Sequence, residues 1–200
     1  MKLYYAQGAC SLVVRIIINE IGLNAEYESV NLKTKETESG KDYYTINHKG
    51  SVPAILIDSS EILTENAVIL QYLADSSNAT QLLPKIGSFP RYRVLEWLNY
   101  ITTEVHKGFG PLFNSSVTQA MKDDIFIPLL LSKLNYVDKS LEGKPYLLGE
   151  HFTLPDAYLF VMLRWATSLK LDIATCQNLN RYFAELGRRP SIQDSLAQEG

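Results

Sequence analysis

Residues 2–12 read KLYYAQGACSL, and the pattern of this stretch changes from strand to helix around one glycine. Residues 2–5 form a short strand-like run, and a turn around Gly8 separates them from residues 11–21, whose apolar side chains recur at helical spacing. Residues 26–32 alternate in the way expected of a second strand. About thirty residues is the usual length of a β-α-β unit. The chain therefore opens on a predicted pair of parallel strands.

The next segment adds two strands and a helix. Residues 54–57 and 61–63 are strand-like runs joined by turn-forming residues at 58–60, a pattern that predicts a hairpin. Thr64 then stands where a helix N-cap is expected, ahead of a further helical run. The first part of the chain is thus predicted to be a βαβ unit followed by ββα.

A stretch at residues 81–90, which contains Pro84, Gly87 and Pro90, separates this α/β part from an all-helical part. We place the first domain at residues 1–80, the linker at 81–86 and the helical domain at 87–200. The predicted helices cover residues 91–109, 118–141, 155–170 and 177–186, with a short piece after Pro190. Pro128 lies within the second of these, where a proline either kinks a helix or marks its boundary.

Charge and cysteine usage exclude several classes of function. The chain has 19 Lys and Arg against 22 Asp and Glu, a net charge of −3 without long runs, which predicts neither nucleic-acid binding nor a polybasic membrane patch. Cys10 and Cys176 match no metal or disulfide spacing. Arg15 and Glu20 interrupt the apolar N-terminus before a signal peptide or membrane span is reached. We expect a cytoplasmic protein with reduced thiols and no metal, whose partner is a small molecule or a protein.

Cys10 is the first candidate for chemistry. It follows a strand and a turn and directly precedes a predicted helix, where unpaired N–H groups and the helix dipole favour an anion. Cysteines in such places have a pKa lowered from about 8.5 to roughly 3.5–7.5, and the thiolate is the nucleophilic form. The alternative is an inert buried side chain, which free cysteine usually is. The strand–turn–helix context favours the reactive interpretation.

Two short motifs have both a structural and a ligand-binding interpretation. Only about 5% of X-Pro bonds are cis, so the bond before Pro53 is expected to be trans. In a thioredoxin-like arrangement, a cis bond here would leave the backbone of Val52 free to pair with an extended peptide. Thr64-Glu65-Asn66 is either plain capping or a site where a ligand carboxylate meets helix N–H groups. In the second case Glu65 meets a ligand ammonium.

The predicted helix at residues 91–109 carries a pair of polar residues. Asn99 and His106 are seven apart, which places them about 20° from each other around an α-helix, beside its apolar stripe. A lone helical histidine is usually structural or solvated. Because Asn99 and Lys107 are nearby, a role for His106 in a ligand cleft is the alternative.

Thr153-Leu154-Pro155-Asp156 has the form of a helix capping box, so we interpret Asp156 as a folding residue. Several aromatic residues of the helical part are predicted to belong to the core or a subunit interface: Trp97, Tyr100, Tyr158, Phe160 and Trp165.

These segments together resemble the glutathione transferases, and most closely the bacterial beta class, over essentially the whole chain. The resemblance is carried by KLYYAQGACSL, TKETESG, KGSVPAIL and LTENAVILQYLAD, followed by EWLNYITTEVHKGFGPLF and FTLPDAYLFVMLRWA. Their order makes the assignment specific. The resemblance implies a glutathione transferase fold, with an N-terminal thioredoxin-like domain that binds glutathione as co-substrate. It also implies that the helical-bundle domain lines the hydrophobic co-substrate site and that the protein is a homodimer.

The resemblance implies roles for individual residues. Cys10 matches the family's reactive cysteine, which can form a mixed disulfide with glutathione, and Ser11 is its neighbour; with His106 they are the predicted catalytic residues. Asn66 replaces the Gly of the beta class or the Ser of the wider family, so its amide either adds a hydrogen bond or crowds the turn. The predicted glutathione-binding residues are Lys35, Val52, Pro53, Glu65, Asn66, Asn99, Lys107 and Glu104, the last reaching the partner subunit's site.

The implied function is detoxification by conjugation of glutathione to hydrophobic electrophiles. Thiol–disulfide exchange through Cys10 is a second implied chemistry. The alternative is a non-catalytic carrier or protein-interaction module that retains the fold.

Overall fold

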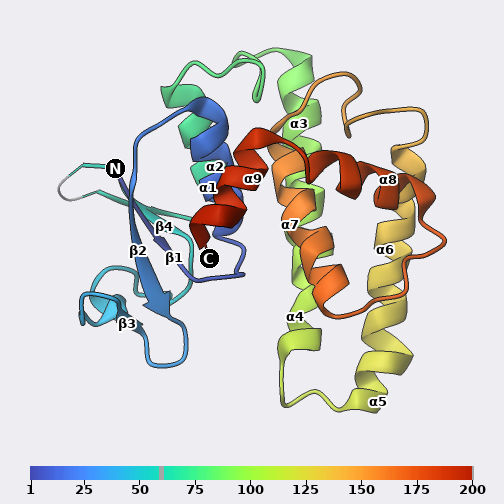
Figure 1. The fold of residues 1–200 in the computed structure, drawn as a ribbon, viewed down its shortest axis with the longest axis horizontal. Helices are drawn as coiled ribbons and strands as arrows, with labels where there is room; N and C mark the ends of the chain where they lie inside the picture. Colours follow the sequence, from blue (N-terminus) through green and yellow to red (C-terminus); the bar gives the residue numbers. More distant parts are fainter. Residues whose placement is uncertain (59–60, 200) are drawn as a thin grey trace. The chain divides into compact units, whose positions relative to one another are not determined.

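The computed structural model describes residues 1–58 and 61–199, and it divides into two compact units (Figure 1). The first comprises Met1–Leu83 together with Arg189–Gly200, and the second comprises Pro84–Arg188. The prediction that residues 87–200 form one helical domain is therefore corrected, because the last segment belongs to the first unit. Ser59 and Ser60 of the predicted turn lie outside the described residues.

The first unit is built on a five-stranded sheet in the order β3-β2-β1-β4-β5. β1 is parallel to β2, and β4 is antiparallel to both β1 and β5, which confirms the predicted βαβ unit and hairpin. The strands are β1 Lys2–Tyr5, β2 Glu26–Asn31, β3 Glu36–Thr37, β4 Ala54–Leu56 and β5 Ile62–Thr64. β3 was not predicted, because a pair of polar residues carries no alternation.

Successive side chains of a strand point to opposite faces of a sheet, and here side chains on both faces are buried. Leu3 and Ile55 are partners in register and are fully buried. The neighbouring Tyr4 belongs to a separate apolar cluster that also contains Val52 and Tyr43, the first residue of the 3-10 helix η1 (Tyr43–Thr45). This second cluster fixes the segment around Val52 against the sheet.

Two helices begin at the ends of strands in this unit. α1 (Leu12–Ile21) is buried from Leu12 to Ile18 and ends at Gly22, whose φ of 75° is a left-handed conformation suited to glycine. α2 covers Asn66–Ser76. Thr64 does not cap α2 as predicted, because its pairing with Ala54 keeps it in β5. Glu65 occupies the cap position instead, without a side-chain capping bond.

α9 (Pro190–Glu199) is fixed to α1 by a set of polar contacts (Figure 1). The Glu20 carboxylate accepts hydrogen bonds from Arg189 Nε at 2.8 Å and from Ser191 Oγ at 2.6 Å. Asn19 Nδ2 donates to Ser195 Oγ at 2.8 Å. These partners are about 170 residues apart in sequence, so no local pattern indicated that α9 packs on the α/β unit.

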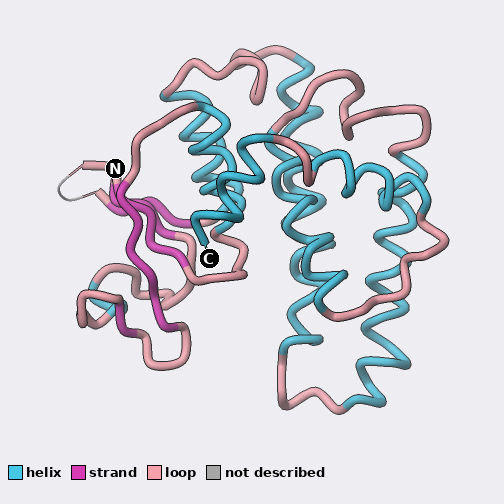
Figure 2. The backbone as a smooth tube through the Cα atoms, viewed as in Figure 1, coloured by secondary structure: helices cyan, strands magenta, loops and turns pink. Residues whose placement is uncertain are grey.

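Every named element of the second unit is helical (Figure 2). The helix predicted at 91–109 consists of three consecutive segments: α3 Phe89–Tyr100, the π-helical η2 Ile101–His106 and α4 Lys107–Phe113. The helix predicted at 118–141 likewise consists of α5 Gln119–Met121, the π-helical η3 Lys122–Phe126 and α6 Ile127–Ser140. Pro128 marks a boundary, since it lies in the first turn of α6. The remaining helices are α7 Leu154–Ser168 and α8 Gln177–Leu186. No helix among the described residues is both long and apolar enough to cross a membrane.

The capping box at the start of α7 is formed as predicted. Asp156 is fully buried and accepts hydrogen bonds from Thr153 N at 2.8 Å, Leu147 N at 3.0 Å and Tyr182 Oη at 2.8 Å. Burial raises the pKa of this carboxyl, and the hydrogen bonds oppose that shift. Asp156 therefore joins three segments of the helical unit, in agreement with a folding role.

We predict that Glu20→Gln lowers the free energy of unfolding at neutral pH by about 2 kcal/mol, because Arg189 loses a charged partner. Burial raises the pKa of Glu20, but its bonds to Arg189 and Ser191 outweigh that effect and hold the pKa below its ordinary value of 4.5. A lowered carboxyl pKa stabilises the fold at higher pH, and this contribution disappears as the pH falls through the folded-state pKa. Urea titrations from pH 7 to pH 3 should show the two proteins converging. A constant difference at all pH values would contradict the ion pair.

Candidate active site

Cys10 lies in the turn between β1 and α1 and is partly exposed. Its thiol Sγ donates a hydrogen bond to the carbonyl oxygen of Val52 at 3.4 Å. Because α1 begins at Leu12, the sulfur belongs to the segment that leads into the helix N-terminus, as predicted. This contact joins the first predicted catalytic residue to the predicted backbone anchor.

Ser11 makes its side-chain hydrogen bonds within the turn that precedes α1. Its side chain is fully buried, and its Oγ donates to Ala6 O and accepts from Ala6 N, both at 3.2 Å. The hydroxyl closes the turn that carries Cys10. Ser11 therefore shapes the turn, and its catalytic role stays a prediction.

The Val52–Pro53 bond is cis, the form that the thioredoxin-like alternative assumed in place of the default trans form. Ser51, just before it, is held by two side chains: Tyr43 Oη donates to its carbonyl at 3.0 Å and Asn47 Nδ2 donates at 2.7 Å. Tyr43 is fully buried. The backbone of Val52 is thus positioned by groups that sequence analysis missed, because tyrosine and asparagine in a polar loop give no distinctive pattern.

Glu65 combines an unusual backbone conformation with an ion pair. Its φ of 71° lies in the left-handed region, which is uncommon for a residue with a side chain and marks a position worth functional attention. Its carboxylate pairs with Lys49 Nζ, which also donates to Thr64 Oγ1 at 3.0 Å. Both Lys49 and Glu65 are exposed.

Lys35 and Asn66 complete the predicted set in this unit. Lys35 Nζ donates to Gly50 O at 2.6 Å, two residues before Val52. Asn66 is the first residue of α2, and its Nδ2 donates to the carbonyl of Cys10 at 3.0 Å. Of the two alternatives for Asn66, its amide adds a hydrogen bond, and the acceptor belongs to the protein.

The predicted residues of the helical unit lie along α3, η2 and α4. Asn99 is exposed in α3, Glu104 Oε2 forms an ion pair with Lys133 Nζ at 2.8 Å, and Lys107 is exposed at the start of α4. The α-helical estimate that put Asn99 and His106 on one polar edge is wrong, because Ile101–His106 is a π segment with a different number of residues per turn. His106 is largely buried, in contrast to Asn99.

His106 is surrounded by aromatic rings. Its Nδ1 is 2.7 Å from the hydroxyl of Tyr158, and its ring centroid is 5.1 Å from that of Trp165. Burial, together with the charge of Lys107, lowers the pKa of His106 to about 4. The imidazole is therefore neutral at pH 7 and can exchange a hydrogen bond with Tyr158.

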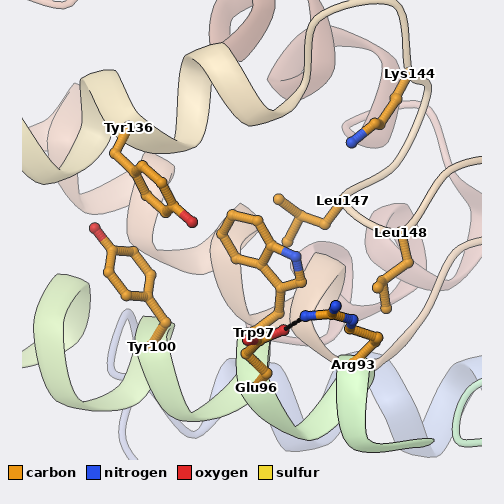
Figure 3. A pocket seen from close by; sticks show the side chains of 8 residues that line it. All are labelled: Arg93, Glu96, Trp97, Tyr100, Tyr136, Lys144, Leu147 and Leu148. Atoms are coloured by element: carbon orange, nitrogen blue, oxygen red, sulfur yellow. Dashed lines mark hydrogen bonds and ion pairs between the residues drawn. The ribbon is translucent and has the colours of Figure 1, made fainter. Parts of the chain in front are cut away.

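A pocket of about 540 Å³ lies within the helical unit, between α3, α6 and the segment after α6 (Figure 3). Trp97 stacks on Tyr136 with ring centroids 5.9 Å apart, and Tyr100 packs against both rings. Arg93 and Glu96 form an ion pair at the other end. Trp97 and Tyr100 thus line an open surface, whereas Tyr158 and Phe160 are buried in the core.

Among residues 1–58 and 61–199, no three or more His, Cys, Asp or Glu side chains form a group that could hold a metal ion. The arrangement in the first unit brings together the Cys10 thiol, the backbone of Val52 and the exposed carboxylate of Glu65 next to the start of α2.

Comparison with known sequences agrees with the resemblance. The family description "Glutathione S-transferase, N-terminal domain" matches residues 1–75, and "Glutathione S-transferase, C-terminal domain" matches residues 100–190. Glutathione S-transferase GstA of Escherichia coli O157:H7 is 44% identical over 200 residues, which cover 100% of this chain and 99% of that protein.

Solved structures give the same result. A sphingomonad glutathione S-transferase complexed with glutathione is 38% identical, with a TM-score of 0.95 over 100% of this chain and 99% of the other. The bacterial beta class glutathione S-transferase of Sphingomonas chungbukensis is also 38% identical, with a TM-score of 0.95 and the same coverage.

We predict that the His106 imidazole titrates with a midpoint near pH 4, because burial disfavours its charged form. Nitrogen-15 NMR of the imidazole groups between pH 3 and pH 9 measures this midpoint, and His106→Gln assigns the signal. The ring should stay neutral through the range from pH 6 to pH 9. A midpoint above pH 6 would contradict the buried position of the ring.

Proposed function

Because this chain belongs to the glutathione S-transferase family and is a glutathione transferase of the beta class, we propose that its N-terminal unit binds glutathione between Cys10 and Glu65. We propose that the bound thiol is conjugated to hydrophobic electrophiles and that Cys10 also exchanges disulfides with glutathione. The observation that carries the proposal is the contact between Cys10 Sγ and the carbonyl of Val52, at 3.4 Å. It joins a nucleophile to a backbone segment suited to a peptide ligand.

Each part of glutathione has a matching group in this unit. The cysteinyl backbone pairs with Val52 in the manner of an added strand, beside Pro53. The γ-glutamyl carboxylate meets the N–H groups at the start of α2, including that of Asn66, and the ammonium meets Glu65. Lys35 meets the glycyl end. Glutathione in the sphingomonad relative supports this proposal.

Two reactions follow from a sulfur in this position. In conjugation, the glutathione thiolate forms a C–S bond to the electrophile and the leaving group departs with the electrons of the bond that breaks, while the protein holds the reactants in the geometry that the reaction requires. In exchange, the Cys10 thiolate attacks a disulfide sulfur of oxidised glutathione, so that one S–S bond forms, another breaks and a glutathione thiolate leaves. The protein's place of action in this proposal is the cytoplasm, where thiols stay reduced, and its role is detoxification.

The proposal extends to residues of the helical unit. Asn99, His106 and Lys107 contribute to binding of the substrates, and Glu104 contributes to the site of the partner subunit. His106, with a pKa of about 4, offers a neutral ring as a hydrogen-bonding group or an apolar wall at pH 7. A neutral imidazole with that pKa is a weak base, so proton transfer by His106 is not part of the proposal.

A second copy of this chain is the proposed partner for the outer face of α5, η3 and α6. Large apolar side chains on this face are exposed: Met121, Ile125, Leu129 and Tyr136. Tyr136 also borders the pocket lined by Trp97 and Tyr100, in which Figure 3 shows the rings grouped at one end. Exposed large apolar side chains gathered on one run of helix are typical of protein contacts, and they support the homodimer that the family implies.

We predict that oxidised glutathione adds one glutathionyl group to the wild-type protein and to Cys176→Ala, but none to Cys10→Ala. Cys176 is buried, donates to Asn135 Oδ1 at 3.2 Å, and has a pKa that burial raises, so it is a matched unreactive thiol. Intact-mass measurement before and after a reducing thiol tests this. An adduct that persists in Cys10→Ala, or none in the wild type, would count against exchange at Cys10.

We predict that Leu129→Asp converts a dimer into a monomer at micromolar concentration, because a carboxylate would be buried in the apolar contact. Leu129 is 56% exposed in the single chain, so the fold itself should tolerate the change. Ile86→Asp is the matched control, since Ile86 is 83% exposed and lies outside the proposed surface. Light scattering after gel filtration measures the mass. Equal masses for Leu129→Asp and the wild type would refute this surface as the interface.

A further inference from the structure

The carbonyl oxygen of Cys10 is held by two donors. One is the backbone N–H of Val13, at 3.2 Å, within the first turn of α1. The other is Asn66 Nδ2, at 3.0 Å, from the first residue of α2. The reactive-cysteine segment is therefore joined to a helix that begins 56 positions away in sequence.

The Asn66 side chain is buried, so the loss of this hydrogen bond costs more free energy than the loss of a surface contact. The residue is 6% exposed, and its Oδ1 is buried without a hydrogen-bond partner among the described residues. An unpaired buried oxygen is unfavourable, and it cannot be relieved by turning the amide, because Oδ1 would then face the Cys10 carbonyl oxygen. The amide orientation is thus set by the bond to Cys10.

The two ends of the Cys10 residue are fixed by different elements. Its carbonyl is held from α2 by Asn66, and its sulfur lies on the carbonyl of Val52, whose segment is held by Tyr43 and Asn47. On the other side of the turn, Gly8 N donates to Glu199 Oε2 at 3.1 Å. Of these contacts, the one from Asn66 reaches the backbone of Cys10 itself.

We propose that Asn66 is a positioning residue for Cys10, and that its side-chain amide fixes the direction of the sulfur toward bound glutathione. This inference rests on the proposed function, because it assumes that Cys10 reacts with glutathione. It also separates two roles of one residue: the backbone N–H serves the ligand carboxylate, while the side chain serves the nucleophile. Loss of the side chain should therefore affect the reaction more than binding.

The test uses Asn66→Ala and Asn66→Asp in a Cys176→Ala background, where Cys10 is the single thiol. Asp has nearly the same volume as Asn but, when ionised, cannot donate to the Cys10 carbonyl. Asn24→Asp is the control for the added charge, because Asn24 is exposed in the same unit. The rate of glutathionyl adduct formation with oxidised glutathione is compared with the rate of alkylation by iodoacetamide, a small reagent that needs no binding site.

We expect both Asn66 variants to form the adduct about 10-fold more slowly, since small displacements of a reacting group have large effects on rate. Alkylation should stay within about twofold of the background protein, because it depends on ionisation and access more than on direction. Asn24→Asp should match the background in both reactions. Unchanged adduct rates in both variants would overturn the proposal, as would full activity in Asn66→Asp alone, which would indicate a role in filling space.

The steady-state kinetics of conjugation provide a second test, which does not depend on the mixed disulfide. With an activated aryl chloride as electrophile, kcat should fall in both variants while the KM for glutathione changes less than about threefold, because the backbone N–H of residue 66 is retained. A rise in the KM for glutathione of about 10-fold with unchanged kcat would contradict a positioning role. Absence of any adduct in the background protein would contradict exchange at Cys10, and the kcat and KM values would then decide the role of Asn66.

Discussion

The contact between the thiol of Cys10 and the carbonyl of Val52 is the interaction on which the candidate site depends. It joins the turn that follows β1 and ends at the start of α1 to the segment with the cis Val52–Pro53 bond, just before β4. Since β1 and β4 are neighbours in the sheet, the two segments meet at one edge. The nucleophile and the backbone proposed to bind its substrate are thereby fixed by the same sheet.

The polar groups around this contact hold the backbone, and few of them are free to meet a ligand. Ser11 closes the turn on Ala6, Tyr43 and Asn47 hold Ser51, and Asn66 holds Cys10. Each is buried, which makes its hydrogen bonds stronger and the cost of losing them larger. The groups that we propose to meet glutathione are instead the sulfur, the backbone of Val52, the first N–H groups of α2, Lys35 and the exposed carboxylate of Glu65.

Local patterns predicted the elements that local physics determines. The strand, turn and helix around Cys10, the hairpin and the capping box at Asp156 each lie within a few residues and were confirmed. The misses involve distant partners: Thr64 stays in β5 because it pairs with Ala54, and α9 joins the first unit through Glu20 and Arg189. The π segments were also missed, because helical periodicity assumes a constant number of residues per turn.

The account as a whole is tested most directly by a crystal structure of the protein with bound glutathione. It predicts that the cysteinyl backbone of the tripeptide pairs with Val52, that its γ-glutamyl carboxylate lies at the start of α2, and that its sulfur lies in contact with Cys10 Sγ. Glutathione bound elsewhere, or oriented with its sulfur away from the turn before α1, would contradict the account.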